Sequence, residues 1–217
     1  MSATLPNGSV LSLATTYGAA IPITVLTNAA PPVATATAHG LTNGDILEVT
    51  SGWLGIDARP ARVAGSTTNN FNLEGHDTTD TTKFPIGSGL GSVRKVLTWT
   101  QISQVMDPAT SGGEQRFVNW NYLEDGNASE RSKPTNRSAK VLTLKLADDP
   151  AQPWNAVLAA ADAAGTPRIL RLALPNGSFL YYNVYVGFDP EPTLSFNNIM
   201  QLTVTLNSAA RFIRYAS

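Results

Sequence analysis

Asp148-Asp-Pro-Ala-Gln-Pro-Trp-Asn-Ala-Val-Leu-Ala-Ala-Ala-Asp-Ala-Ala-Gly-Thr-Pro167 is the stretch that decides the fold. It predicts one short helix with a signal at each end. The two aspartates at its start can accept hydrogen bonds from the first free amides, and Pro150 fits the first turn. Gly165 suits the left-handed position after a helix, and the proline that follows prevents continuation. One apolar stripe recurs at helical spacing on Trp154, Val157, Leu158 and Ala161.

Three runs typical of β-strands follow this helix directly. Leucines alternate with other residues from 170 to 174, which is the period of a strand. The turn Pro175-Asn-Gly-Ser178 leads into a second run, Phe179 to Val186, because Asn-Gly tolerates the positive φ angles of a tight hairpin. That run is apolar on both faces, which a sheet with one face in water would not need. We expect residues 189–192 to interrupt the strand pattern before a last strand over 200–207.

The order of these elements resembles the C-terminal half of siphophage tail tube (major tail) proteins. The resemblance is carried by the helix that ends in Ala-Gly-Thr-Pro, the hairpin built on Leu-Pro-Asn-Gly, and the closing strand Leu-Thr-Val-Thr-Leu. It implies a mainly β fold, a barrel-forming β-sandwich flanked by one α-helix. It also implies subunits that stack as hexameric rings around a channel that conducts DNA. The implied partners are other copies of the chain, a tape-measure protein, a tail terminator and baseplate or tip proteins, in a virion tail assembled in the bacterial host cytoplasm.

Residues 23–96 differ in character from the rest, being rich in Thr, Asn, Gly and Ser with short β-prone runs. The segment 38–49 resembles a small β-barrel module that recurs in phage virion proteins, and 70–75 resembles its closing strand. A stretch this long without structure of its own would be unusual. We therefore predict that 1–22 and 97–217 form the tail tube domain. Residues 23–96 are predicted to form an inserted small all-β domain, whose exit at 87–92 is a flexible linker.

Between 97 and 147 the pattern predicts strands separated by a turn at 107–115 and by a polar stretch at 124–140. Tail tube proteins carry a long loop at this place that reaches the next ring, and the resemblance implies that role here. The alternative is a solvated hairpin loop. When unbound, the stretch should be disordered, because it has too few apolar residues to offset the entropy of ordering its backbone.

Candidate contact residues between subunits come from this stretch and from the C-terminal hairpin. Trp120 stands beside the polar stretch and fits the core and an interface equally well, whereas Trp99 and Trp154 are expected in the core. The tyrosines of the hairpin could contact a neighbour, because two apolar faces need a second partner. The candidates are Trp120, Tyr122, Glu124, Asp125, Glu130, Arg131, Lys133, Arg137, Tyr181, Tyr182 and Tyr185.

Composition limits the function further. Only 14% of the residues are charged, against roughly 25% in an average soluble domain, so we expect neighbours to cover much of the surface. The formal net charge of −1 argues against tight binding of phosphates. The absence of cysteine excludes disulfides, thiolate metal sites and cysteine catalysis. No apolar run approaches the roughly 20 residues of a membrane span, and no secretory signal is visible.

Nothing in the sequence positions a catalytic group. The two histidines, His39 and His76, lie in Gly-rich turns and are predicted as surface turn residues, with a ligand or base as the alternative. No Gly-x-Ser-x-Gly motif is present. We therefore expect no enzyme activity, no cofactor and no metal site, and favour a structural protein that assembles with itself. The alternatives are a β-sandwich module that binds a receptor or carbohydrate through the insertion, and a hydrolase with an unrecognised site.

Overall fold

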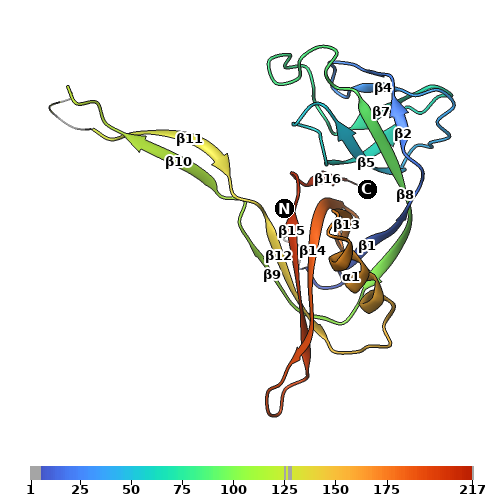
Figure 1. The fold of residues 1–217 in the computed structure, drawn as a ribbon, viewed down its shortest axis with the longest axis vertical. Coiled ribbons are helices and arrows are strands. Elements are labelled where there is room, and N and C mark those ends of the chain that lie inside the picture. The colour runs from blue at the N-terminus through green and yellow to red at the C-terminus, as the bar shows by residue number, and fades with distance from the viewer. Residues whose placement is uncertain (1–5, 125, 127–128, 217) are drawn as a thin grey trace.

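The computed structural model describes residues 6–124, 126 and 129–216 (Figure 1). Within that part the chain is mainly β with one helix, α1 (Pro153–Ala164), as predicted. The first eight strands are β1 (Val10–Tyr17), β2 (Ile21–Ile23), β3 (Val25–Leu26), β4 (Val33–Thr35), β5 (Ile46–Ser51), β6 (Pro60–Ala64), β7 (Asn70–Glu74) and β8 (Gly91–Ile102). The others are β9 (Val105–Ser111), β10 (Gln115–Trp120), β11 (Arg131–Arg137), β12 (Val141–Ala147), β13 (Arg168–Ala173), β14 (Phe179–Thr193), β15 (Gln201–Ser208) and β16 (Ile213–Tyr215).

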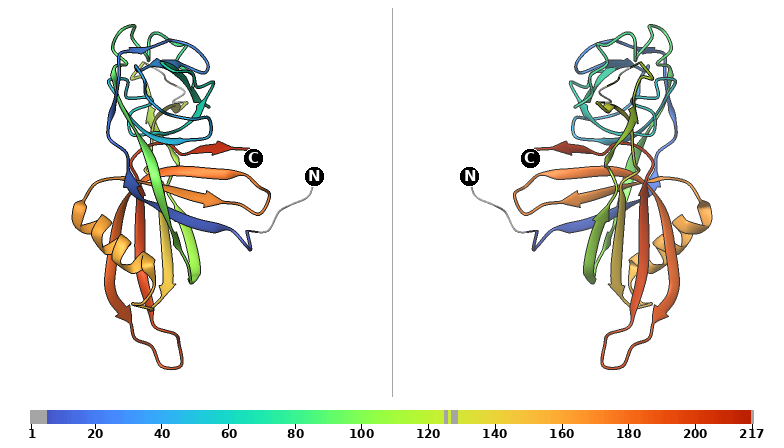
Figure 2. Two further views of the ribbon diagram at one scale, coloured as in Figure 1. Left: turned by 90° about the vertical axis from the view of Figure 1, so that its right-hand side faces the viewer. Right: turned by 90° about the vertical axis from the view of Figure 1, so that its left-hand side faces the viewer.

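One long curled sheet runs through the molecule in the order β3-β4-β7-β6-β5-β8-β1-β13-β14-β15-β12-β9, with β16 added to β14 and β2 to β8. We call β2 to β7 with the first half of β8 the upper lobe, and β1, the rest of β8, β9, β12 to β16 and α1 the body (Figure 1). Strands β10 and β11 form a separate two-stranded ribbon, the arm. Figure 2 shows that the β13–β14 hairpin and the lower strands run in different directions, so the sheet turns a corner.

Helix α1 packs against the body sheet through the predicted stripe, with Trp154, Leu158 and Ala161 fully buried. It ends as predicted at Gly165, whose φ is 58°. Its start differs from the prediction, because the N-cap is Gln152 and the proline of the first turn is Pro153. Asp148 and Asp149 lie at a turn just before the helix, where Asp149 accepts a hydrogen bond from the amide of Ala151.

The upper lobe has its own core, built around Trp53, Phe71 and Leu73. All the short β-prone runs of this region are strands, and the last two residues of its predicted exit at 87–92 already belong to β8. Gly91 opens β8, and a Cβ there would stand 2.0 Å from the carbonyl oxygen of Thr50. Strand β8 pairs first with β5 and β2 and then with β1, so it crosses from lobe to body without a break. The division into two domains therefore remains a prediction.

Both histidines are buried, which corrects their prediction as surface residues. Nδ1 of His39 accepts a hydrogen bond from the amide of Leu41, and the ring packs edge-on against Phe71. Nε2 of His76 lies 3.1 Å from the carbonyl oxygen of Pro60. Burial, with Arg59 nearby, lowers the pKa of His76 to about 4. Both rings therefore make their polar contacts with the backbone of the lobe itself.

A third cluster forms the seam between lobe and body, where Ile46 and Val96 meet Tyr181, Ile213 and Tyr215. The hydroxyl of Tyr215 accepts a hydrogen bond from the amide of Arg62 at 2.8 Å and donates to the carbonyl of Glu74 at 2.9 Å. The seam therefore depends on the last strand, β16, which the sequence did not predict.

Two further predictions in the body were wrong, and a third segment, in the arm, is more ordered than expected. Residues 107–111 belong to β9 and not to a turn, and β14 continues through the expected break at 189–192. Within the polar stretch, which was expected to be disordered when unbound, Arg131–Arg137 form strand β11, which pairs with β10 along the arm. All three segments contain proline or many polar residues. An edge strand or an isolated ribbon tolerates both, because part of its backbone faces water.

Candidate assembly surfaces

The lower part of the body is a four-stranded sheet, β9-β12-β15-β14, with two different faces. One face carries the apolar core against α1. Strand register arranges the other face in rows of residues that lie opposite one another. We call this the polar face, and its rows are Ser111-Val141-Asn207-Tyr185, Ala109-Thr143-Thr205-Gly187 and Asp107-Lys145-Thr203-Asp189. These positions are half-buried or exposed. Most of these side chains are polar, and such an open sheet face is suited to contact with water.

Both outer strands of this sheet have an edge without a strand partner among the described residues. Strand β9 ends the sheet order, and β13 pairs with β14 only as far as Val184. The amide of Phe188 lies 3.4 Å from Oδ1 of Asp162 on α1, which shows that it points away from β15. The backbone groups of Val186 face the same open edge at a period of two, whereas Pro190 and Pro192 lie within a register irregularity between Asp189 and Thr193 and carry no amide donor.

The open edge of β9 has a complementary pattern. The amide of Ala147 donates to the carbonyl of Gln104, so the odd-numbered backbone groups of β12 point to β9. Register pairs Thr143 of β12 with Ala109, and the backbone of Thr110, one residue further, therefore points outward. Thr110 keeps an amide donor at this edge. The two edges can thus complete each other only between different copies of the chain.

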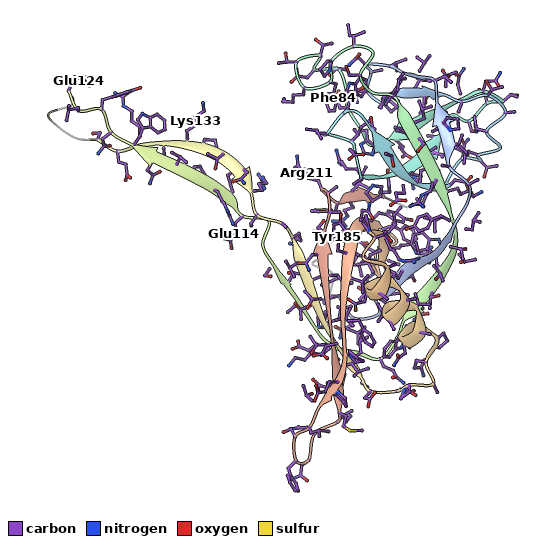
Figure 3. All side chains as sticks on the ribbon, viewed as in Figure 1. Phe84, Glu114, Glu124, Lys133, Tyr185 and Arg211 are labelled. Atoms are coloured by element: carbon purple, nitrogen blue, oxygen red, sulfur yellow. The ribbon has the colours of Figure 1, made fainter. Side chains whose placement is uncertain are left out.

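The arm extends away from the body (Figure 3). Val118 and Trp120 lie opposite Lys133 and Arg131 across the ribbon, so they share one face. The guanidinium of Arg131 also lies 4.7 Å from the ring centroid of Tyr122. Strands β10 and β11 contain four basic residues and no acidic residue. The arm therefore presents a basic and apolar surface.

The predicted contact residues of the arm are accessible. Trp120 is half-buried, whereas Tyr122 is exposed. The charged candidates among the described residues are exposed as well: Glu124, Glu130, Arg131, Lys133 and Arg137. Asp125 lies outside the described residues.

The three tyrosines of the hairpin are placed differently from one another. Tyr181 is buried in the seam, where desolvation raises the pKa of its hydroxyl. Tyr182 is half-buried, and its ring stacks on Phe212 with centroids 5.3 Å apart. Tyr185 is exposed on the polar face. Tyr185 is therefore the most accessible of the three, and Tyr181 packs within its own chain.

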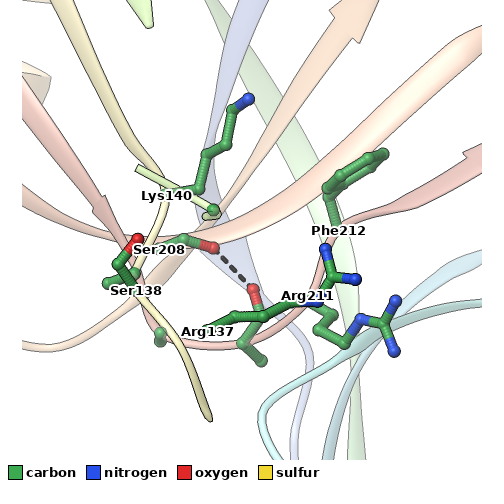
Figure 4. A pocket seen from close by; sticks show the side chains of 10 residues that line it. Arg137, Ser138, Lys140, Ser208, Arg211 and Phe212 are labelled. Carbon is green, nitrogen blue, oxygen red and sulfur yellow. Dashed lines mark hydrogen bonds between the residues drawn. The ribbon is translucent and has the colours of Figure 1, made fainter. Parts of the chain in front are cut away.

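A hollow lies where the arm joins the body (Figure 4). It encloses about 360 Å³ between Gly113, residues 137–140 and residues 208–212. Three cationic side chains line it, Arg137, Lys140 and Arg211, together with the ring of Phe212. No carboxylate lines it. We call this the basic hollow.

The connection between β14 and β15 ends the body opposite the hollow, and we call residues 194–200 the tip (Figure 1). It exposes several large apolar side chains, and Phe196 is 98% exposed. Neither the tip nor the hollow was predicted, and the tip follows a segment, 189–192, that was expected to break the strand. A phenylalanine, a leucine and an isoleucine inside a turn-like segment were the available signal. The exposed apolar residues are Leu194, Phe196, Ile199 and Met200.

The described residues include no helix with the length and hydrophobicity of a membrane span. A search of curated proteins finds no significant match. Among solved structures, a chain in the tail of an empty GTA particle with C6 symmetry is similar at a TM-score of 0.44 and 12% identity, over 54% of this chain and 87% of that chain. A chain in the virion of a native gene transfer agent particle gives 0.43 and 13%, over 54% and 89%. A chain in the anti-feeding prophage cap gives 0.37 and 18%, over 54% and 83%.

The family comparison covers most of the sequence. The model of the phage tail tube protein family, TTP, matches residues 51–217. The match includes the lower sheet with its open edges, the arm, the basic hollow and the tip. The chain therefore belongs to the phage tail tube protein family, and it is a structural component of a virion tail and not an enzyme.

Proposed function

We propose that six copies of this chain close into a ring, and that such rings stack into the tube of a siphophage tail through which DNA passes. A tape-measure protein occupies the channel during assembly. A terminator and baseplate or tip proteins bind the two ends of the tube. The family membership supports the tube, and the lower sheet supports its construction from rings.

The observation that carries this proposal is the pair of open edges on the lower sheet. An unpaired edge leaves backbone donors and acceptors that another strand can satisfy. The β14 edge offers the backbone carbonyls of Val186 and Phe188, which face away from β15, and the β9 edge offers the amide of Thr110. Pairing β9 of one copy with β14 of the next is a head-to-tail contact, and such contacts close into rings under cyclic symmetry.

Closing the ring in this way turns the polar face into a continuous wall. The core face cannot line the channel, because α1 covers it. The polar face carries Asp107, Lys145 and Asp189 as its charged residues, a net charge of −1 per copy. Tight binding of DNA requires clustered cations that release counterions. A wall with one lysine between two carboxylates should let DNA slide past.

The upper lobe belongs on the outside of this tube. It lies above the body on the side of α1, away from the arm (Figure 1). The proposed ring contact and the channel wall use no residue of the lobe. The lobe is thus available for contacts beyond the tube without disturbing ring closure.

Electron microscopy of the purified chain tests the proposal, with two variants at the β9 edge. Thr110→Pro removes the amide donor at the open edge, and an edge strand tolerates proline. Thr110→Val keeps that amide and serves as the matched control. We expect rings or tubes from the native chain and from Thr110→Val, and folded subunits without rings from Thr110→Pro. A native chain that stays monomeric at high concentration would overturn the proposal.

A further inference from the structure

We infer that the tip of one copy docks into the basic hollow of a second copy, and that this contact joins successive rings. The inference rests on the proposed stacking of rings and names the two surfaces that meet. The tip supplies apolar side chains and nearby carboxylates. The hollow supplies cations and an aromatic ring. The two surfaces carry opposite charges, and both carry apolar side chains.

The two surfaces cannot meet within one molecule. The tip directly precedes β15 and the hollow directly follows it, so they lie at opposite ends of this strand. Eight residues of extended chain separate them, a span of about 26 Å at 3.3 Å per residue. Tip and hollow can therefore join only between copies. A contact between two different surfaces repeats without limit when the copies are displaced along one axis, which is how a tube grows.

Charge favours this pairing. Asp189 and Glu191 stand on β14 just before the tip, and both are exposed. The amide of Asp148 donates to the carbonyl of Met200, which brings a further carboxylate to the base of the tip. Among the described residues, none of these three forms an ion pair within the chain. The same holds for Arg137, Lys140 and Arg211 in the hollow, so opposite charges without partners lie at the two ends.

The apolar parts of the two surfaces also complement each other. Leu194 and Phe196 of the tip project into solvent, with 80% and 98% of their surfaces exposed. A monomer gains nothing from such exposure, whereas contiguous exposed apolar side chains mark interaction sites. In the hollow, Phe212 and Ala139 offer an apolar lining beside the cations. The arm, which joins the body at the hollow, carries two further exposed apolar side chains, Phe117 and Val118.

Charge reversal tests the pairing in the full-length chain. Asp148→Lys with Glu191→Lys reverses the charge beside the tip without touching the polar face, and Lys140→Glu with Arg211→Glu reverses the hollow. We expect either pair to raise the protein concentration at which tubes form by about tenfold or more, and all four substitutions together to restore it. Asp77→Lys with Asp80→Lys is the matched control on the upper lobe and should leave tube formation unchanged. Variants that form tubes as the native chain does would overturn the inference.

Cysteine crosslinking gives an independent measurement, because the chain contains no cysteine. Phe196→Cys and Phe212→Cys in one chain place one thiol on the tip and one in the hollow. Under oxidation we expect a ladder of covalent dimers, trimers and longer chains. Leu54→Cys with Phe212→Cys is the control, because Leu54 is as exposed as the tip residues but lies on the upper lobe.

The outcomes separate the two proposals. Native tubes without a tip–hollow ladder would overturn the docking and leave the tube intact. Absence of any native polymer would overturn the tube and the docking together. A ladder with native tubes, absent from the control, supports both.

Discussion

Replacing Tyr215 by phenylalanine should weaken the seam between lobe and body. The hydroxyl is the only part removed, and it bridges the amide of Arg62 and the carbonyl of Glu74 at 2.8 and 2.9 Å. Burial raises the pKa of Tyr215 well above its ordinary value, so this hydroxyl keeps its proton and remains a donor. The substitution keeps the ring and its packing, and therefore isolates the two hydrogen bonds.

The expected loss of stability follows from the two backbone groups that the substitution leaves without a hydrogen-bond partner. Tyr215 is buried, so its loss leaves one amide and one carbonyl without partners in a region that water does not reach freely. An unsatisfied buried polar group costs about 1–3 kcal/mol, and we expect a combined loss of about 3 kcal/mol in the free energy of unfolding. For a chain of this size, that corresponds to a fall in Tm of about 6–12 °C.

Urea unfolding and thermal scans of the isolated subunit measure this loss. Tyr122→Phe is the matched control, because it removes the same atom from an exposed ring on the arm and should change stability by less than about 0.5 kcal/mol. The reasoning is refuted if Tyr215→Phe and Tyr122→Phe destabilise the subunit equally.

Three further predictions concern the two cores and the helix end. The pKa of His76 is lowered to about 4 in the folded chain, against about 6.5 when unfolded, so stability should be complete above pH 6.5. It should fall by about 3 kcal/mol as the pH drops to 4, and His76→Gln should flatten this profile in urea titrations at several pH values. Trp154→Ala empties a fully buried site and should cost about 4 kcal/mol in the same assay. Gly165→Ala forces a left-handed conformation and should cost about 1 kcal/mol, measured as a fall in Tm.

Local periodicity predicted the elements whose side chains alternate between core and water. The stripe on α1 and the strands β12 and β15 are examples, because the core selects every second or every third to fourth side chain. The short runs of the upper lobe were predicted for the same reason. Fold class and family followed from the order of these elements.

The segments that sequence reasoning misread depend on contacts far along the chain. Proline at 108, 190 and 192 suggested turns, yet each residue lies in an edge strand where a missing amide removes no ladder bond. Residues 131–137 have little to bury, but β10 provides backbone partners for them across the ribbon. Which strand is an edge is decided by the whole sheet, and no local window contains that information.

Part of the candidate site could be predicted from sequence. The polar stretch pointed to the arm, whose charged side chains are exposed. The basic hollow could not be found, because Arg211 and Arg137 are brought together by β12 and β15. Their pairing across the sheet creates the hollow, although 73 positions separate them in the sequence.

Strand β8 runs without interruption from the upper lobe into the body. On the other side of the junction, Tyr215 of the body forms a hydrogen bond with the lobe. Because the lobe is held at two sides, rotating it against the body would require breaking the backbone hydrogen bonds between β8 and either β1 or β5. In a symmetric ring every lobe would consequently hold the same angle to the channel axis. Whatever the lobes touch outside the tube would meet a regularly spaced, rigid array.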